Sequence, residues 1–240
     1  MQPGEKPSLE GRIALVTGAS RGIGRASAIA LAKAGAHVIL VARTVGGLEE
    51  TDDEIRKLGG TATLVPMNLR DFDAIDRLGA SIYERWGRLD ALLGNAGVLG
   101  VLTPMAHLEP KVFTEVMEVN VTANWRLIRS LDPLLRQSDA GRVLFVTSGA
   151  ARKHIPYWGA YALSKSALEI LALTYAAECE KTNVRVNLIN PGPMRTLMRQ
   201  KAMPGEDPEY LIKPDEMAYK VVEMLSPGYT LNETIINFQK

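Results

Sequence analysis

Cysteine is almost absent from this 240-residue sequence, which contains a single one, Cys179. One cysteine allows no intramolecular disulfide, so we expect a reducing compartment, the cytoplasm, and an ordinary buried role for this side chain. The sequence also lacks any apolar run near the roughly 20 residues that a membrane-spanning helix needs. Residues 1–9 carry prolines and a glycine in place of a hydrophobic signal core, and we expect them to be a flexible lead-in.

An excess of either charge is missing as well. The 28 lysines and arginines nearly balance the 27 aspartates and glutamates, which leaves a formal net charge of +1. Such a surface offers no broad attraction to nucleic acid or to anionic lipid, although a local basic site remains open. Histidine, cysteine and carboxylate residues show no spacing typical of a metal site, so we expect no catalytic metal.

Hydrophobic residues make up 46% of the sequence, enough for a substantial core, and they occur in short strand-like runs that alternate with helical patterns. Strands are predicted over 13–16, 37–41, 61–65, 89–93, 143–147, 185–189 and 234–238. Helices are predicted over 22–34, 48–58, 71–86, 110–137, 160–181 and 215–225. This alternation indicates a seven-stranded, mostly parallel sheet that is covered on both faces and binds ligands at the carboxyl ends of its strands.

No internal repeat, low-complexity tract or long polar linker divides the chain. Glycines follow the first two predicted helices, at Gly35 and at Gly59-Gly60, as is typical of helix ends. We therefore expect residues 10–240 to form one α/β domain, a Rossmann-type three-layer sandwich of helices, sheet and helices.

A glycine-rich turn connects the first predicted strand to the first helix, with the sequence Thr17-Gly18-Ala19-Ser20-Arg21-Gly22-Ile23-Gly24. Its glycines suit three tasks: a tight turn at Gly18, close backbone approach to a phosphate at Gly22, and tight packing of helix on strand at Gly24. The helix N-terminus would then donate N–H groups to a pyrophosphate. Taken alone, the turn is also compatible with a purely structural role.

Tyr161 and Lys165 lie four residues apart on a predicted helix and therefore share one face of it. A phenol with the usual pKa of ~10 is a poor proton shuttle at neutral pH, and a neighbouring ammonium favours its ionised form. The pair therefore indicates acid–base chemistry in which the lysine lowers the pKa of the tyrosine.

With these motifs in this order, the sequence resembles the short-chain dehydrogenase/reductase family. The resemblance runs from about Gly11 to Thr196. It rests on the glycine turn, Asn95-Ala96-Gly97, Asn120, Ser148, Tyr161-x-x-x-Lys165 and Pro191-Gly192-Pro193-Met194-Arg195-Thr196. Any one of these motifs arises by chance, but the ordered set is specific. It implies an oxidoreductase that transfers hydride with a nicotinamide dinucleotide.

The resemblance implies a role for each of four side chains. Tyr161 would be the general acid in carbonyl reduction and the general base in alcohol oxidation, while Ser148 would polarise the substrate oxygen. Lys165 would also hold the nicotinamide ribose, and Asn120 would anchor a water on a proton path to solvent. Each residue has a structural alternative: a turn cap for Ser148, a packed ring, a solvated lysine, or a helix-distorting amide.

The resemblance also implies which residues border the dinucleotide. They are Gly18, Ser20, Arg21, Gly22, Ile23, Gly24, Arg43, Asn68, Leu69, Asn95, Ala96, Gly97, Tyr161, Lys165, Pro191, Gly192 and Thr196. Two positions depart from the family pattern, since Asn68 stands where an aspartate is frequent and Gly94 where an asparagine is frequent. We expect adenine contact to survive at Asn68, because an amide both donates and accepts, and we expect Gly94 to loosen the turn that follows it.

Charge near the second predicted strand favours NADP(H) over NAD(H). Proteins that prefer NAD usually place an acid about 20 residues beyond the glycine turn, to bind the ribose 2′-hydroxyl. Here that strand ends at Arg43, and no carboxylate follows until Glu49. Arg43 and Arg21 are suited to a 2′-phosphate, although two solvated surface arginines are the alternative and NAD(H) stays possible.

Information about the substrate is thinner. The loop between Ser148 and Tyr161 offers Ala150, Ile155 and Trp158 to the reacting carbon, and Met194, Leu197, Met198 and Met203 are candidates for an apolar cover. Ordinary core packing is the alternative for all of them. His154 is expected to be a loop residue. The prolines and glycine of 204–208 are expected to break any helix there, and the carboxyl end lacks the Asp-Gly-Gly ending common in the family.

The leading hypothesis is an NADP(H)-dependent carbonyl reductase or secondary-alcohol dehydrogenase that acts on a small molecule. A 3-oxoacyl thioester reductase is an alternative within the same chemistry, and a non-catalytic dinucleotide-binding regulator or a structural module is an alternative outside it. The predicted helices 110–137 and 160–181 match those through which relatives assemble, so we expect a homodimer or homotetramer.

Overall fold

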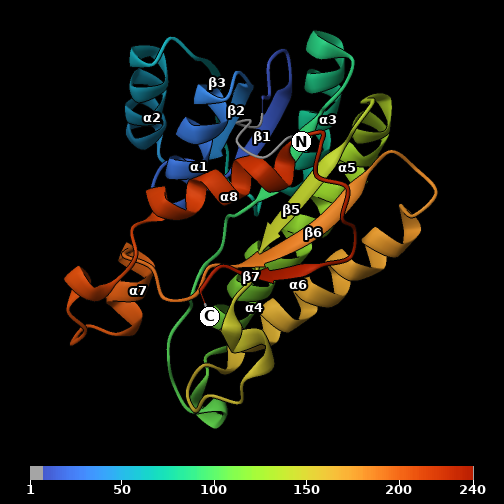
Figure 1. The fold of residues 1–240 in the computed structure, drawn as a ribbon. Helices are drawn as coiled ribbons and strands as arrows, with labels where there is room; N and C mark the ends of the chain where they lie inside the picture. Colours follow the sequence, from blue (N-terminus) through green and yellow to red (C-terminus); the bar gives the residue numbers. More distant parts are fainter. Residues whose placement is uncertain (1–7, 240) are drawn as a thin grey trace.

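A seven-stranded sheet, parallel throughout, forms the centre of the computed structural model, which describes residues 8–239 (Figure 1). The strands lie in the order β3-β2-β1-β4-β5-β6-β7. They span β1 Ile13–Thr17, β2 His37–Ala42, β3 Thr61–Pro66, β4 Ala91–Gly94, β5 Arg142–Val146, β6 Arg185–Asn190 and β7 Ile235–Asn237. The order reverses at β1, so the carboxyl ends of β1 and β4 flank the point where an open sheet of this type binds its ligand.

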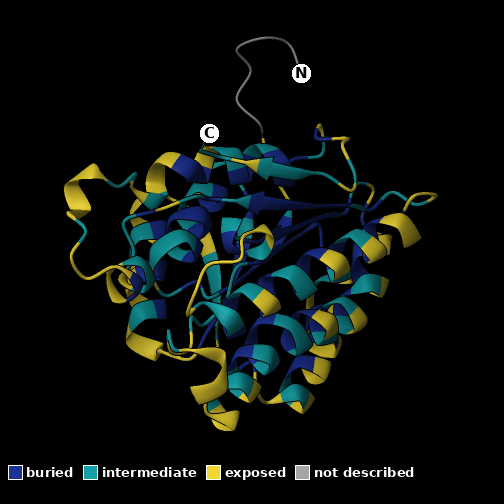
Figure 2. Ribbon diagram, turned by 90° about the horizontal axis from the view of Figure 1, so that it is seen from below, coloured by how far each residue is buried: buried dark blue, intermediate teal, exposed yellow. Residues whose placement is uncertain are grey.

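Helices cover both faces of the sheet and bury one apolar core on each side. Their bounds are α1 Gly22–Lys33, α2 Val45–Lys57, α3 Phe72–Trp86, α4 Pro110–Met117, α5 Ala123–Gln137, α6 Gly159–Glu178, α7 Leu197–Ala202 and α8 Pro214–Leu225. Alternate residues of β1 point to opposite faces: Leu15 packs with α3, α5 and α6, whereas Val16 packs with α1, α2 and α8. The expected three-layer α/β fold is confirmed, and exposed residues line the outer helix faces (Figure 2).

The predicted helix over 110–137 is interrupted, and the interruption carries a candidate site residue. Between α4 and α5 lies a π-helical segment, η2 (Glu118–Thr122), with Asn120 at its centre. The Asn120 side chain is held by the backbone of Val98, and the backbone carbonyl of Asn120 accepts a hydrogen bond from Asn124 Nδ2 at 2.8 Å. Contacts with a loop distant in sequence therefore shape this segment, and helical periodicity does not reveal them.

A short helix that the sequence did not predict, α7, lies just before the helix break expected over 204–208. Thr196 caps it by accepting a hydrogen bond from Arg199 N, and it ends at Ala202, before Pro204. The short 3₁₀ turn η4 (Pro208–Tyr210) follows. Figure 1 shows α7 standing out from the body of the molecule beside the carboxyl ends of the strands.

At the amino end, the expected flexible lead-in of residues 1–9 lies mostly outside the described residues. Leu9 is an exception, because its side chain is buried in the core beside α1 and its N–H donates to the Ala34 carbonyl at 2.8 Å. Leu9 is thus part of the packed structure.

Candidate active site

A cleft of about 1290 Å³ opens at the carboxyl ends of the strands and gathers nearly every residue that the sequence nominated. Of the expected catalytic, cofactor and substrate residues, only Gly24 and Asn120 do not line it. The nominated residues that do are Gly18, Ser20, Arg21, Gly22, Ile23, Arg43, Asn68, Leu69, Asn95, Ala96, Gly97, Ser148, Ala150, Ile155, Trp158, Tyr161, Lys165, Pro191, Gly192, Met194, Thr196, Leu197, Met198 and Met203. Residues far apart in the sequence therefore meet in one place, as the strand order requires.

The glycine turn has the geometry that its residues predict. Gly18 adopts a φ of +68°, which disfavours any side chain, and a Cβ on Gly24 would lie 2.2 Å from the Gly18 carbonyl oxygen. Thr17 ties this turn to the next strand end, because its hydroxyl accepts hydrogen bonds from the N–H groups of Asn95 and Ala96, each at 3.0 Å. These hydrogen bonds join the backbone at the carboxyl ends of β1 and β4, which lies at the base of the cleft.

Helix α6 places Tyr161 and Lys165 on its inner face, against the strand end that carries Ser148. The Tyr161 side chain is buried, and burial raises the pKa of its phenol, while a hydrogen bond with Ser148 acts in the opposite direction. Phenol and serine are therefore close enough to act on one substrate oxygen. Ser148 also accepts from the N–H of Ala150 at 3.2 Å, so it caps the 3₁₀ turn η3 (Gly149–Arg152) as well.

Lys165 lies beside Tyr161 and is buried as deeply. Its ammonium donates to the Val146 carbonyl at 2.8 Å and lies 5.8 Å from the centroid of the Tyr161 ring. Burial lowers the pKa of Lys165 to about 8, against the opposing influence of Glu169. Burial dominates at both residues, so the pKa of Tyr161 is raised on balance, and the lowering of this pKa by Lys165 stays a prediction.

Asn120 is buried behind the cleft wall. Its Oδ1 accepts from Val98 N at 2.8 Å, and its Nδ2 donates to the Val98 carbonyl and to the Ser164 hydroxyl, each at 2.9 Å. Ser164 precedes Lys165 on α6. Asn120 therefore links the loop after β4 to the helix that carries Tyr161 and Lys165.

Arg21 and Arg43 are exposed on the wall of the cleft near the glycine turn. Arg21 is the N-cap residue of α1, and its side chain makes no capping hydrogen bond. Among residues 8–239, neither arginine has a carboxylate partner. Both guanidinium groups are thus available to a phosphate.

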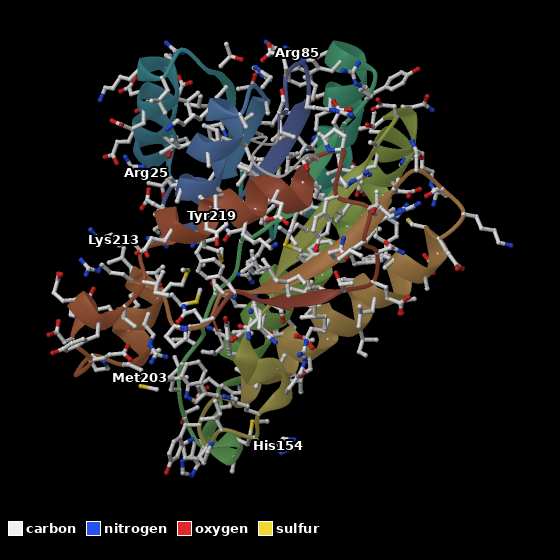
Figure 3. All side chains as sticks on the ribbon, in the orientation of Figure 1. Arg25, Arg85, His154, Met203, Lys213 and Tyr219 are labelled. Atoms are coloured by element: carbon white, nitrogen blue, oxygen red, sulfur yellow. The ribbon has the colours of Figure 1, made fainter. Side chains whose placement is uncertain are left out.

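The opposite end of the cleft is apolar. Trp158 stands edge-on to Tyr161 with ring centroids 5.9 Å apart, and Met194 is buried where it forms a bridge with Ile212. Met203 directly follows α7, and Figure 3 shows it beyond the carboxyl ends of the strands. His154 is exposed on a loop at the lower edge of the same view and does not line the cleft, as expected for a loop residue.

The carboxyl end supplies residues that the sequence did not nominate. Gln239 Nε2 donates to the carbonyls of Pro191 at 2.8 Å and Pro193 at 2.7 Å, and Asn237 Oδ1 accepts from Asn190 Nδ2 at 2.9 Å. Gln239 and Asn237 both line the cleft. The only sequence signal was the unusual ending itself, which gave no reason to place it beside the Pro191–Pro193 loop.

Residues 8–239 contain neither a membrane-spanning helix nor a cluster of metal-binding side chains. No helix in that part of the chain combines the length and apolarity needed to cross a bilayer. Nor does it bring three or more histidine, cysteine, aspartate or glutamate side chains together as a metal site would.

Comparison with known proteins agrees with this geometry. The family model described as short chain dehydrogenase matches residues 12–207. The chain belongs to the short-chain dehydrogenase/reductase family. Members of this family are oxidoreductases that bind a nicotinamide dinucleotide, and the chain is an enzyme of this class.

Relatives of this short-chain dehydrogenase/reductase span almost its whole length. The oxidoreductase YciK of Escherichia coli is 41% identical over 87% of this chain and 84% of its own. A solved short chain dehydrogenase structure from Pseudomonas syringae has a TM-score of 0.94 at 40% identity, covering 98% of this chain and 97% of that one. A structure from Escherichia coli CFT073, complexed with NADPH, has a TM-score of 0.92 at 36% identity, covering 98% and 100%.

Proposed function

We propose that this chain is an NADP(H)-dependent enzyme that reduces a small-molecule carbonyl, or oxidises the corresponding secondary alcohol, with Tyr161 as general acid and base. The observation that carries the proposal is the meeting of Ser148, Tyr161 and Lys165 in the same cleft as the glycine turn. If these residues had only structural roles, they would not need to share a partly open cleft.

The residues of the cleft suit a reaction that transfers a hydride to the carbonyl carbon and a proton to the carbonyl oxygen. When bound, the nicotinamide would supply a hydride to the carbonyl carbon. The Ser148 hydroxyl would donate a hydrogen bond to the substrate oxygen, and the Tyr161 phenol would transfer its proton to that oxygen. Because the pKa of the phenol is raised, Tyr161 is protonated at neutral pH, as an acid in the reductive direction must be. Lys165, held by the Val146 carbonyl, would place positive charge beside the phenolate that remains.

The wall that holds Arg21 and Arg43 supports NADP(H) as the cofactor. Gly18 and Gly22 have positive φ angles and leave room for a phosphate-bearing ligand beside the α1 N-terminus. The guanidinium groups of Arg21 and Arg43 suit a 2′-phosphate, and the similar structure from Escherichia coli CFT073 is complexed with NADPH.

A substrate screen followed by one substitution tests the reaction. Purified protein is given NADPH with a panel of ketones, aldehydes and 3-oxoacyl thioesters, and loss of absorbance of the reduced cofactor is recorded. With a substrate in hand, Tyr161→Phe is expected to lower kcat by about 10²- to 10⁴-fold and to leave the dissociation constant of NADPH unchanged. Tyr157→Phe is the matched control, since Tyr157 is exposed on the loop just before α6.

Two results would contradict the proposed acid. One is a Tyr161→Phe variant with wild-type turnover. The other is tight NADPH binding by the wild-type protein with no turnover across the panel, which would favour a dinucleotide-binding regulator.

Cofactor choice is tested at Arg43. Arg43→Ala is expected to raise the dissociation constant of NADPH by about 10-fold or more and to leave that of NADH unchanged, because a charge-assisted contact to a phosphate is worth about 1.5–3 kcal/mol. Calorimetric titration with both reduced cofactors measures this. Arg77→Ala, an exposed arginine on α3, is the control. Equal losses for NADPH and NADH would rule out a 2′-phosphate contact.

A further inference from the structure

A buried carboxylate, Glu169, lies one helical turn beyond Lys165 on the inner face of α6. Its Oε1 accepts a hydrogen bond from the Thr147 hydroxyl at 2.7 Å. Both of its oxygens accept from the Arg152 guanidinium, at 3.0 Å from Nε and 3.2 Å from Nη2. Thr147 directly precedes Ser148, and Arg152 ends the turn that follows it. The Glu169 side chain is therefore hydrogen-bonded to residues on both sides of Ser148.

These hydrogen bonds of Glu169 join the two segments that carry the proposed catalytic residues. Tyr161 and Lys165 belong to α6, whereas Ser148 belongs to the strand end and the η3 turn. A second tie, from the Ser166 hydroxyl to the Ala151 carbonyl, links the same turn to the same helix. The position of Ser148 relative to Tyr161 thus depends on side chains of α6 that do not themselves line the cleft.

The charge of Glu169 also acts on Lys165. The carboxylate opposes the lowering of the Lys165 pKa by burial. Arg152, which is half exposed, supplies a compensating positive charge to Glu169. Glu169 therefore favours the protonated lysine, and Arg152 weakens that influence.

Other elements packed on α6 bring few competing charges to this cluster. From β5 come the uncharged Thr147 hydroxyl and the Val146 carbonyl, and from η2 the amide of Asn120. On η2, Glu118 is paired with Arg70, and on β6, Arg185 donates to the carbonyls of Thr182 and Val184. On α4, Lys111 and Glu115 form no ion pair within the described part of the chain.

We propose that Glu169 is a positioning residue of the active site, which orients Ser148 through Thr147 and Arg152 and places a negative charge one helical turn from Lys165. The proposal rests on the proposed function for its effect on turnover, but its effect on Lys165 exists in the protein without substrate. Turnover and lysine titration are therefore separate readouts.

The first experiment separates kcat from binding. Glu169→Gln keeps the shape of the side chain and removes its charge, so it is expected to lower kcat by about 10- to 100-fold, the cost of a small misplacement in an active site. The dissociation constant of NADPH is expected to change far less, because the glycine turn is untouched. Glu178→Gln, which neutralises an exposed carboxylate on the same helix, is the control and should behave as wild type.

The second experiment follows Lys165 directly by NMR of protein labelled with ¹³C-lysine. The resonance that is missing from Lys165→Met identifies it. Its titration midpoint is expected near pH 8 in the wild-type protein. It should fall by about half a pH unit or more in Glu169→Gln, because a stabilising negative charge is lost. In Arg152→Gln it should rise, because the carboxylate is no longer offset.

A third variant separates the effect of the Glu169 charge from the effect of its position. Glu169→Asp restores the carboxylate but retracts it by one methylene group, so the Lys165 midpoint should return toward its wild-type value while kcat stays reduced. Melting curves show whether each variant folds. If Glu169→Gln does not fold, Arg152→Gln decides the matter alone, because Arg152 sits at the surface.

The outcomes are distinguishable. An active wild-type enzyme whose Glu169→Gln variant keeps both its kcat and its Lys165 midpoint overturns the role of Glu169. An unchanged midpoint in Arg152→Gln, where only that variant folds, overturns it too. A wild-type protein without turnover overturns the proposed function, and the opposed shifts of the Lys165 midpoint would still support Glu169 as the group that holds the lysine charge.

Discussion

Lys165 stands in an environment that opposes its own charge. Its side chain is almost fully buried, with one hydrogen bond to the Val146 carbonyl and one buried carboxylate a turn away. Desolvation of an ammonium is expensive, and here burial outweighs the carboxylate, because the pKa falls to about 8. A residue placed in this way reduces stability near neutral pH, as is common where a side chain serves a site and not the core.

This cost predicts a particular dependence of stability on pH. The lysine pKa is about 8 in the folded chain and 10.5 in its ordinary environment, so the unfolded chain binds more protons between these values. The contribution of Lys165 to the free energy of unfolding therefore rises with pH across that interval, by up to about 3 kcal/mol. Urea denaturation at several pH values should show the gap between wild type and Lys165→Met changing by this amount from pH 8 upward.

Lys111→Met provides the control for this measurement, because Lys111 is exposed on α4. Its difference from wild type should stay constant with pH. If the gap for Lys165→Met were equally constant, the ammonium would not be desolvated in the folded chain.

Single residues also show what the sequence hides. Gly94 departs from the family pattern, and from the sequence we expected a looser turn. The structure gives another reason for it: a Cβ on Gly94 would lie 2.3 Å from Phe145 Cδ1 and 3.0 Å from Asn124 Oδ1. The glycine accommodates two side chains that follow it by 30 residues or more. Such pairings arise in three dimensions and leave no local pattern.

At the scale of elements, regular structure was predictable and irregular structure was not. Hydrophobic alternation and helix-stop glycines predicted seven strands and the main helices, since local patterns determine both. The π-helical segment around Asn120 depends on hydrogen bonds to Val98, and α7 depends on a Thr196 cap. Motif order predicted most residues that were expected to form the cleft, but it predicted neither Gln239, which lines the cleft, nor Glu169, which lies behind it, because their partners are distant in sequence.

The carboxyl-terminal element offers a prediction of its own. Gln239 bridges the carbonyls of Pro191 and Pro193, and its side chain touches Gly192, so it fixes the loop expected to border the nicotinamide. Gln239→Ala should raise the dissociation constant of NADPH about three- to tenfold, because each lost hydrogen bond is worth about 1 kcal/mol. Gln239→Glu should bind more weakly still, since a carboxylate cannot donate to carbonyls.

Calorimetric titration measures both variants, with Gln137→Ala, an exposed glutamine at the end of α5, as the control. Wild-type affinity in Gln239→Glu would show that the tail does not support the cofactor loop.

Across the whole molecule, the carboxyl ends of the strands form the cleft, and the amino ends hold a charge network that stabilises the sheet. At the amino ends, Asp90 is buried and accepts hydrogen bonds from Arg12, Arg88, Ser138 and the N–H of Ile13. These partners tie the starts of β1 and β4 to the segment before β5. A charge network that spans three chain segments there secures the sheet without entering the site.

Asp90→Asn is therefore expected to damage stability and spare chemistry. Removing one partner from a buried ion pair costs about 3–5 kcal/mol, which lowers the melting midpoint of a chain this long by about 10 °C. Asp139→Asn, the exposed partner of the same Arg12, should change stability by less than about 0.5 kcal/mol. Because the amide lies at the far end of the strands, NADPH should raise the melting midpoint of Asp90→Asn and of the wild type by similar increments, measured by calorimetry. A variant that melts like wild type, or that loses its response to NADPH, would show that the two ends of the sheet do not divide stability from binding in this way.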